Sequence, residues 1–202
     1  MQADVFRAWV GTAARAVEEQ RDHLTQLDAA IGDADHGGNL ARGFAAVLTA
    51  LETATPATPG AVLTLTGSTL ISKVGGASGP LYGTLFMTLG KALPPEPSLG
   101  DLIAAFDQAI AAVRARGKSD VGQKTMLDVF CPVLGVLRAG GDDLPGRLKV
   151  TAKLAAEKTI PMRAIRGRAS FLGERSIGHM DPGARSSALI VDAVADVMEG
   201  FG

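Results

Sequence analysis

The sequence predicts an all-α protein, and three observations support this class. Apolar residues recur at three- and four-residue steps along most of the chain. They are mostly Ala, Leu and Val, while aromatic residues make up only 4% of the chain, which favours packed helices over sheets. Stretches rich in proline and glycine separate the periodic segments. We therefore expect eight amphipathic helices, with residues 1–202 forming one domain.

The N-terminal half contains four of the expected helices. The first carries apolar residues at helical spacing from Phe6 to Leu27. The second covers residues 40–51 and stops before TATPATPG, because its prolines cannot continue a helix. The third covers AVLTLTGSTLISKV and ends at Gly75, and the fourth covers PLYGTLFMTLGKAL.

The fifth helix begins after Ser98, whose side chain can cap it. Gly117 follows at a position where a helix end favours a residue with positive φ. The sixth covers KTMLDVFCPVLGVLRAG, with a kink expected at Pro132.

The seventh helix is expected from Leu144 to about residue 166. The eighth begins at DPGARSSALIVDAVADVMEGF, where Asp181 can cap and Pro182 takes the first helical position. The sum is eight helices, with no convincing strand.

The charge balance excludes two classes of partner. The chain has 20 Lys and Arg residues against 21 Asp and Glu residues, so no basic field is available to hold nucleic acid or an anionic membrane. No apolar run approaches the roughly 20 residues that span a bilayer, and MQADVFRAWVGTAARAVEEQ lacks the plan of a signal peptide. We therefore expect a cytoplasmic protein.

Three carboxylates, Asp28, Asp33 and Asp35, lie within eight positions in LDAAIGDADHGGNLARGF. On one straight helix Asp33 would lie about 140° around the axis from Asp28, so the three could not meet. Gly32 can end the helix and allow a turn that lets them converge. Carboxylates about 4 Å apart repel by roughly 4 kcal/mol at an effective dielectric constant of about 20, so a converged cluster requires cations or protons.

Ligands that are all oxygen select a hard cation such as Mg²⁺ or Ca²⁺. An EF-hand loop that starts at Asp33 would have a glutamate at its twelfth position, which is Phe44 here. The calcium-loop hypothesis therefore fails, and Mg²⁺ with phosphate oxygens and waters fits better. From spacing alone, a solvated acidic loop that caps the next helix is an equally weighted alternative.

Two further stretches could bind an anion. HGGN, residues 36–39, opens a helix whose N-terminal amides attract negative charge. VGGASGP, residues 74–80, contains three glycines that let backbone amides approach an anion. Taken alone, His36 could be a core or capping residue and the glycine loop an ordinary connection. RGKS is not the end of a P-loop, because residue 112 is alanine and a helix rather than a strand precedes it.

The stretch RGRASFLGERSIGHMDPGARSS carries four arginines, Arg166, Arg168, Arg175 and Arg185, with little helical pattern. Guanidinium groups near a carboxylate and metal site commonly serve phosphate oxygens. A surface loop held by salt bridges is the alternative. Structureless loops of about a dozen residues are uncommon without a function, which favours a binding role.

The chain resembles the L subunits of dihydroxyacetone kinases, the nucleotide-binding half of those enzymes. Four stretches carry the resemblance in the same order over nearly the whole chain: LDAAIGDADHGGN, SKVGGASGPLYGTLF, RGKSDVGQKTMLDV and GRASFLGERSIGHMDPGA. Gly38 and Phe171 are minor departures from the family pattern. The resemblance implies a barrel of eight amphipathic antiparallel helices with the nucleotide site at one rim, in agreement with the independent count of eight.

The resemblance also implies ADP or ATP and two Mg²⁺ ions as cofactors. Asp28, Asp33 and Asp35 would hold the two ions, which bridge the phosphates. Arg168 would bind the nucleotide and act in catalysis by offsetting charge on the γ-phosphate. The other nucleotide-binding positions it implies are His36, Gly37, Gly38, Asn39, Ala77, Ser78, Gly117, Met126, Asp181, Pro182 and Gly183.

The implied reaction is phosphoryl transfer from Mg-bound ATP to dihydroxyacetone, held by a partner K subunit, to give dihydroxyacetone phosphate. In the form that depends on the phosphoenolpyruvate phosphotransferase system, ADP stays bound and an M subunit rephosphorylates it. That form is a phosphoenolpyruvate–glycerone phosphotransferase, with an alcohol group as acceptor. An L-type subunit of an ATP-dependent kinase for glycerone or a related ketose is the alternative, although a free-standing chain of 202 residues favours the former.

Two other classes of function stay open from the sequence. A metal-dependent hydrolase of a phosphorylated or nucleotide substrate would use the same carboxylates and would turn over substrate without a partner. A regulatory binding module would use the same surface to hold a transcription regulator, a further partner that the resemblance implies, without any phosphoryl flux.

Overall fold

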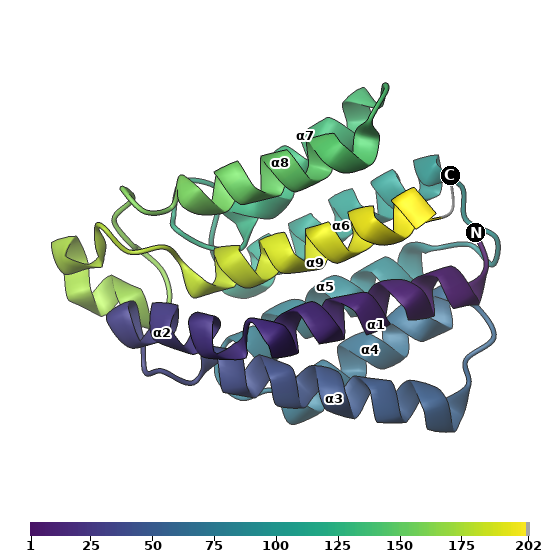
Figure 1. Cartoon of the computed structure of the whole chain (residues 1–202), viewed down its shortest axis with the longest axis horizontal. Coiled ribbons are helices and arrows are strands. Elements are labelled where there is room, and N and C mark those ends of the chain that lie inside the picture. Colours follow the sequence, from purple (N-terminus) through teal and green to yellow (C-terminus); the bar gives the residue numbers. More distant parts are fainter. Residues whose placement is uncertain (201–202) are drawn as a thin grey trace.

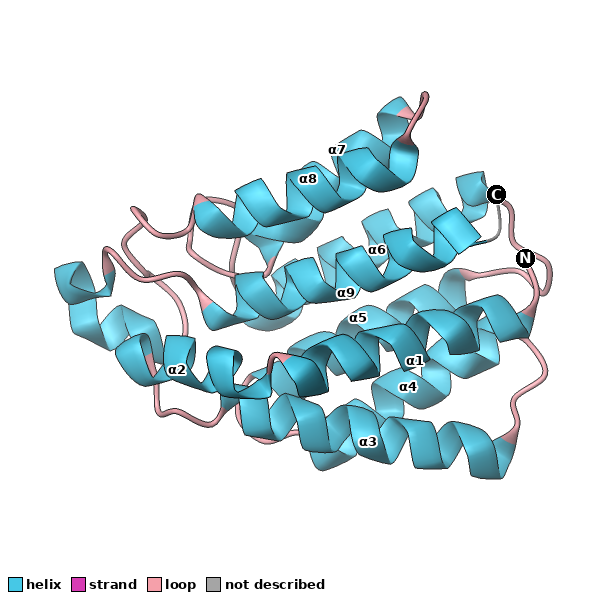
Figure 2. Ribbon diagram, in the orientation of Figure 1, coloured by secondary structure: helices cyan, strands magenta, loops and turns pink. Residues whose placement is uncertain are grey.

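The computed structural model describes residues 1–200, which contain helices and no strand (Figures 1 and 2). The predicted all-α class is therefore confirmed. None of the helices in these residues combines the length and the apolar character that crossing a bilayer requires. The elements, with η1 a 3₁₀ segment, are α1 Ala3–Glu19, α2 Arg21–Ile31, α3 His36–Ala54, α4 Pro59–Lys73, α5 Ser78–Ala92, α6 Leu99–Gly117, α7 Leu127–Ala139, α8 Leu144–Glu157, η1 Arg168–Ser176 and α9 Pro182–Gly200.

Eight of the helices pack in a closed ring. Its order is α1, α3, α4, α5, α6, α7, α8 and α9, and α9 packs back against α1. Successive members of the ring run in opposite directions along the long axis of the molecule (Figure 1). The ninth, α2, follows α1 and packs against α3, α9 and η1 at one end of the ring.

One predicted helix proves to be two. α1 ends at Glu19 and α2 begins at Arg21, with Gln20 between them, whereas the sequence predicted one continuous helix. The apolar periodicity runs through this junction, and no glycine or proline interrupts it. The break is therefore set by packing of the second segment against α3 and η1 rather than by a local signal.

Two predicted helix ends differ from the structure. α8 ends at Glu157 and not near residue 166, because the chain turns before Pro161, which cannot donate a helical hydrogen bond. α6 includes Gly117, and the residue with positive φ is Lys118, at φ 47°. The glycine therefore does not serve as the left-handed end residue that the sequence suggested.

Two predicted caps are confirmed. At α6, Asp101 N donates to Ser98 Oγ over 3.2 Å and Ser98 N donates to Asp101 Oδ2 over 2.9 Å. At α9, Ala184 N donates to Asp181 Oδ2 over 2.7 Å, and Pro182 is the first helical residue. Each cap satisfies amides that the helix itself leaves without a partner.

The interior of the ring is filled by apolar side chains that all nine helices contribute. Two edge-to-face aromatic pairs lie within it: Phe44 with Phe86, at a centroid distance of 6.4 Å, and Phe106 with Phe130, at 5.7 Å. Burial of each such side chain stabilises the fold by roughly 1.5–3 kcal/mol. The core supplies the rigid support for the loops at the ends of the ring.

α4 and α5 approach each other unusually closely, because glycines face each other across their contact. A methyl group at Gly67 would lie 2.6 Å from Gly83 O and 2.6 Å from Met87 N. Both are backbone atoms of a packed helix, so neither can give way cheaply. Gly11 of α1, by contrast, has nothing within 4 Å of the same position.

We expect Gly67→Ala to destabilise the protein. Overpacking costs about 1–3 kcal/mol, and the better helix propensity of alanine returns at most about 1 kcal/mol. The matched control is Gly11→Ala, which should stabilise by about 0.5–1 kcal/mol because it adds no clash. The free energy of unfolding from urea denaturation measures both changes. A Gly67→Ala protein as stable as Gly11→Ala would contradict the close approach of α4 and α5.

Candidate functional site

A cleft of about 420 Å³ opens at one end of the ring. Its walls come from the α2–α3 turn, the α4–α5 loop, the α6–α7 loop and the segment between α8 and α9. These connections gather at the left end of the molecule in Figure 1. α3, α5, α7 and α9 all begin at this end, and the partial positive charge of a helix N-terminus favours anions.

The structure brings the three acidic residues of the α2–α3 turn together. Asp28 lies in the last turn of α2, Asp33 and Asp35 follow it, and one oxygen of each lies within 4.8 Å of the others. As predicted, the helix ends at Ile31 and Gly32 follows. A methyl group at Gly32 would lie 2.0 Å from Asp28 Oδ1, so a side chain at this position would displace the Asp28 carboxylate.

Asp28 also holds the start of α3. Its Oδ2 accepts hydrogen bonds from Asp35 N at 2.9 Å and His36 N at 3.1 Å. This leaves Oδ1, together with the carboxylates of Asp33 and Asp35, for a cation. Three convergent carboxylates suit a hard divalent ion, which would remove the repulsion among them.

Arg168 reaches the cluster from the segment between α8 and α9. Its Nη2 lies 3.1 Å from Asp33 Oδ2, while its side chain is 69% exposed. An exposed pair of this kind contributes roughly 0–1 kcal/mol. Arg168 can therefore leave Asp33 at little cost when another anion enters the cleft.

A chain of hydrogen bonds runs under the floor of the cleft. His36 Nδ1 pairs with Ser78 Oγ at 3.0 Å, and His36 Nε2 pairs with Ser186 Oγ at 2.9 Å. Tyr82 Oη then pairs with Ser186 Oγ at 2.6 Å and Ser187 Oγ at 2.9 Å. The chain joins the first turns of α3, α5 and α9, so it fixes three helix N-termini relative to one another.

Burial determines the protonation states of His36 and Tyr82 in this series of hydrogen bonds. Desolvation lowers the pKa of His36, although the charges of Asp28 and Asp35 act in the opposite direction. A neutral imidazole donates from one nitrogen and accepts at the other, which matches two hydroxyl partners. Burial also raises the pKa of Tyr82, so its hydroxyl keeps its proton.

The N-terminus of α5 is suited to a phosphate group. α4, α6, α8 and α9 are each capped by a side chain, whereas Ala77 precedes α5 and offers no acceptor to its amides. Gly76 takes φ 65°, and a methyl group at Gly79 would lie 2.3 Å from Val74 O. The glycine loop therefore places the uncapped amides that follow Ala77 beside the cleft.

A further wall is formed by the α6–α7 loop and the start of α9. Gly117, Met126 and Gly183 line it with Asp181. Desolvation raises the pKa of Asp181 to about 7, although the bond from Ala184 N and the charge of a nearby lysine lower it. This wall is less charged than the wall that carries the carboxylates.

Most residues predicted for the site line the cleft, but three do not. Gly37 lies against α2, where a methyl group would be 2.0 Å from Arg21 O. Asn39 is buried and accepts a hydrogen bond from Arg42. Gly38 is likewise absent from the lining. Their predicted role at a nucleotide stays a prediction, and the structure gives Gly37 a packing role.

Sequence reasoning missed three residues that build the site. Tyr82 and Ser186 form the hydrogen-bonded floor, and Lys124 lies in the wall of the α6–α7 loop. No local spacing marks them, because their partners are far away in the sequence. The one available signal was that Tyr82 is the sole tyrosine of the chain and falls in an otherwise apolar helix.

The fold and the cleft define an all-helical protein in which three converging carboxylates lie beside a helix N-terminus. The DAK2 domain family model matches residues 30–196. The chain belongs to the DAK2 domain family.

The relatives that match along nearly their whole length include two ADP-binding subunits of dihydroxyacetone kinases. The PEP-dependent dihydroxyacetone kinase 1, ADP-binding subunit DhaL of Listeria innocua is 43% identical over 187 residues, with 92% of each chain covered. The PEP-dependent dihydroxyacetone kinase, ADP-binding subunit DhaL of Escherichia coli is 42% identical, with 93% of each covered. The rat triokinase/FMN cyclase is 36% identical, but the match covers only 32% of that protein.

Solved structures show the same fold. The dihydroxyacetone kinase of C. freundii in its native form superposes with a TM-score of 0.76 at 26% identity, over 97% of this chain and 34% of that one. The same enzyme in complex with AMP-PNP and Mg²⁺ superposes with a TM-score of 0.75.

We expect Asp33→Asn to weaken Mg²⁺-dependent ADP binding by at least about tenfold, because it removes a charged ligand from the cluster. Isothermal titration calorimetry with and without Mg²⁺ measures the loss. The helical circular dichroism signal should stay unchanged. Asp22→Asn, at an exposed position on α2, is the matched control and should bind normally. Unaltered binding by Asp33→Asn would show that the carboxylates do not hold a metal.

Proposed function

We propose that this chain is the nucleotide-binding subunit of a dihydroxyacetone kinase. It would present the γ-phosphate of Mg-bound ATP to dihydroxyacetone held by a partner K subunit, giving dihydroxyacetone phosphate and ADP. The observation that carries this proposal is the meeting of three carboxylates, an uncapped helix N-terminus and Arg168 around one cleft. The names of the relatives from Listeria innocua and Escherichia coli support it.

The residues present fit a magnesium nucleotide. Asp28, Asp33 and Asp35 would hold two Mg²⁺ ions, which supply charge neutralisation for the phosphates when bound. The amides that follow Ala77 would bind phosphate oxygens. Arg168 would turn from Asp33 to the γ-phosphate, where its planar fork can bind two oxygens.

The remaining parts of the cleft suit the nucleoside. Gly117 and Met126 would border the adenosine, with Asp181, Pro182 and Gly183 beside them. His36 would act by orienting the Ser78 hydroxyl at the phosphate end. No side chain of the site would form a covalent bond to phosphorus. The chain's contribution would be positioning and electrostatics.

We propose the form that depends on the phosphoenolpyruvate phosphotransferase system. ADP would then stay in the cleft as a coenzyme, and a cytoplasmic M subunit would rephosphorylate it. Two facts support this choice over an ATP-dependent kinase. The separate ADP-binding subunits match this chain along nearly their full length, whereas the match to the rat triokinase covers about a third of that protein.

The protein purified without added nucleotide should retain close to one ADP per chain. Mass spectrometry of the native protein, followed by quantification of released nucleotide, measures this. Dialysis against a chelator should release the ADP, because without Mg²⁺ the carboxylates repel the negatively charged phosphates.

The rival functions give different results. An empty cleft that exchanges ATP freely would support the ATP-dependent alternative and contradict the coenzyme role. Phosphate release from nucleotide without any partner would indicate a hydrolase. Partner binding with no phosphoryl transfer after addition of K and M subunits would indicate a regulatory module.

The rim of the cleft also offers a place for the K subunit. Phe171 lies in η1, in the turn that precedes the kink at Gly173, and its side chain is 87% exposed. η1 begins with Arg168, so a partner that covers Phe171 would meet the phosphate end of the cleft. Large exposed aromatic side chains are typical anchors of protein interfaces.

We expect Phe171→Asp to weaken association with the K subunit by at least about tenfold, the effect of losing an interface anchor. Surface plasmon resonance with immobilised K subunit measures it. ADP retention should not change, which separates docking from nucleotide binding. Val150→Asp on α8, at a residue 58% exposed, is the control and should associate normally. Equal affinities of the two variants would exclude η1 from the interface.

A further inference from the structure

Lys124, in the α6–α7 loop, is a buried lysine that the proposed function does not use. Its side chain is 1% exposed. Nζ donates to Thr159 O at 2.7 Å, to Met162 O at 3.1 Å and to His179 O, and Ile160 O lies at 3.5 Å. Within residues 1–200, no carboxylate forms a salt bridge with it. All hydrogen bonds of its ammonium group therefore go to backbone carbonyls, and the nearby carboxyl group of Asp181 interacts with it only through its charge.

This arrangement is unfavourable in two ways. Burying an ammonium group that forms no salt bridge costs free energy even where carbonyls accept its protons. Lys124 also takes φ 63°, a backbone conformation that residues with a side chain rarely adopt. Such positions persist where the surrounding structure requires them and they cluster at functional sites. Lys118, with φ 47° and an exposed side chain, shares the backbone conformation without the burial.

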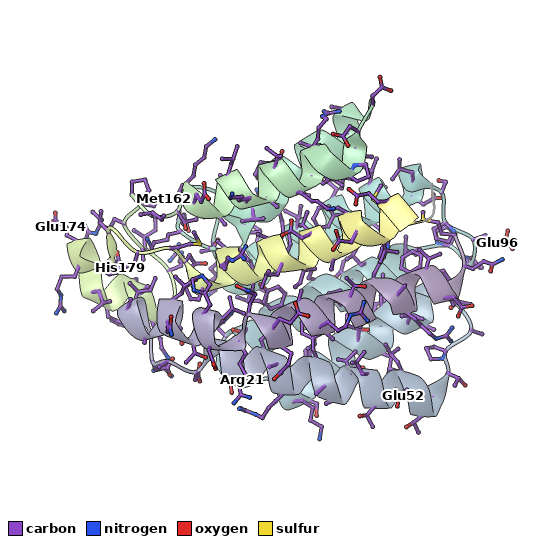
Figure 3. All side chains as sticks on the ribbon, in the orientation of Figure 1. Arg21, Glu52, Glu96, Met162, Glu174 and His179 are labelled. Atoms are coloured by element: carbon purple, nitrogen blue, oxygen red, sulfur yellow. The ribbon has the colours of Figure 1, made fainter. Side chains whose placement is uncertain are left out.

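The carbonyls around the ammonium group come from the two ends of one segment. Met162 and His179 flank residues 163–178, the segment that leaves the ring after α8 and returns before α9. Both lie at the same end of the molecule in Figure 3. The Lys124 ammonium group therefore joins the two ends of a 16-residue segment. The tip of this segment places Arg168 beside the carboxylate cluster.

Two other hydrogen bonds close the base of the same segment. Gly178 N donates to Ile160 O at 2.8 Å, and Ala164 N donates to Ser176 Oγ at 2.9 Å. The base also reaches α9, because Asp181 N donates to Thr159 Oγ1 at 3.0 Å. The carbonyls of Thr159, Ile160 and Met162 that face Lys124 follow the end of α8, and that of His179 lies just before α9.

We propose that Lys124 is a positioning residue that closes the base of segment 163–178 and thereby holds Arg168 over the carboxylate cluster. The importance of Arg168 rests on the proposed function. The closure itself is a property of the chain without any ligand. The two can therefore be tested separately.

Hydrogen exchange followed by mass spectrometry tests the closure in the protein without nucleotide. In Lys124→Met, amides of residues 163–178 should exchange at least about tenfold faster, because several buried carbonyls lose their donor. Peptides from α3, α4 and α5 should exchange as in the wild type. Lys118→Met is the control, with the same substitution at a left-handed position, and should not change exchange in the segment. Unchanged exchange in a folded Lys124→Met protein would overturn the proposal.

A milder variant covers the case in which Lys124→Met does not fold. Ser176→Ala removes the bond from Ala164 N without burying or removing a charge. It should speed exchange in the same segment by a smaller factor and leave the helices protected. If Ser176→Ala instead speeds exchange equally across the ring helices, the segment does not open as a unit and the proposal fails.

A double-mutant cycle tests whether Lys124 acts through Arg168. Calorimetry of ADP with Mg²⁺ should show weaker binding for Lys124→Met and for Arg168→Ala, with no further loss in the double variant. Losses that multiply would overturn the positioning role. If the wild type binds no ADP, the proposed function fails, while the exchange experiment still decides the closure.

Discussion

The alternating directions of the eight ring helices place four helix N-termini beside the cleft. Eight helices that alternate in direction must place four N-termini at one end, and here α3, α5, α7 and α9 begin at the cleft. Each N-terminus carries a partial positive charge of about half an elementary charge. The C-termini of α4, α6 and α8 lie at the same end, so the attraction for an anion is local to the exposed amides at each helix start and is not a field of the whole end.

The carboxylates lie at this same end because α2 extends beyond the ring. α2 ends at Ile31, and the turn back into α3 brings Asp28, Asp33 and Asp35 together. Three negative groups beside four helix N-termini attract a cation on one side and an anion on the other. The magnesium nucleotide that we propose carries both charges, so it would satisfy both halves of the site in one cleft.

Local signals in the sequence were sufficient for some features and not for others. Gly32 and the spacing of the acidic residues predicted their convergence, and Ser98 and Asp181 predicted helix starts, because each acts within a few residues. The break at Gln20 has no such signal and depends on packing against α3 and η1. The role of Lys124 was equally hidden, since its partners lie 35 to 55 residues away.

The segment between α8 and α9 combines a firm base with a loosely held tip. At the base, hydrogen bonds join Lys124 to the two stretches of backbone that follow α8 and precede α9, so opening it leaves polar groups without partners. At the tip, Arg168 makes an exposed pair with Asp33 that is cheap to exchange. A firm base keeps the guanidinium within reach of the cleft and lowers the entropy lost on binding. Because the ion pair at the tip is weak, Arg168 would exchange the Asp33 carboxylate for a phosphate at little cost. The base therefore restrains the segment, while the tip can change its partner.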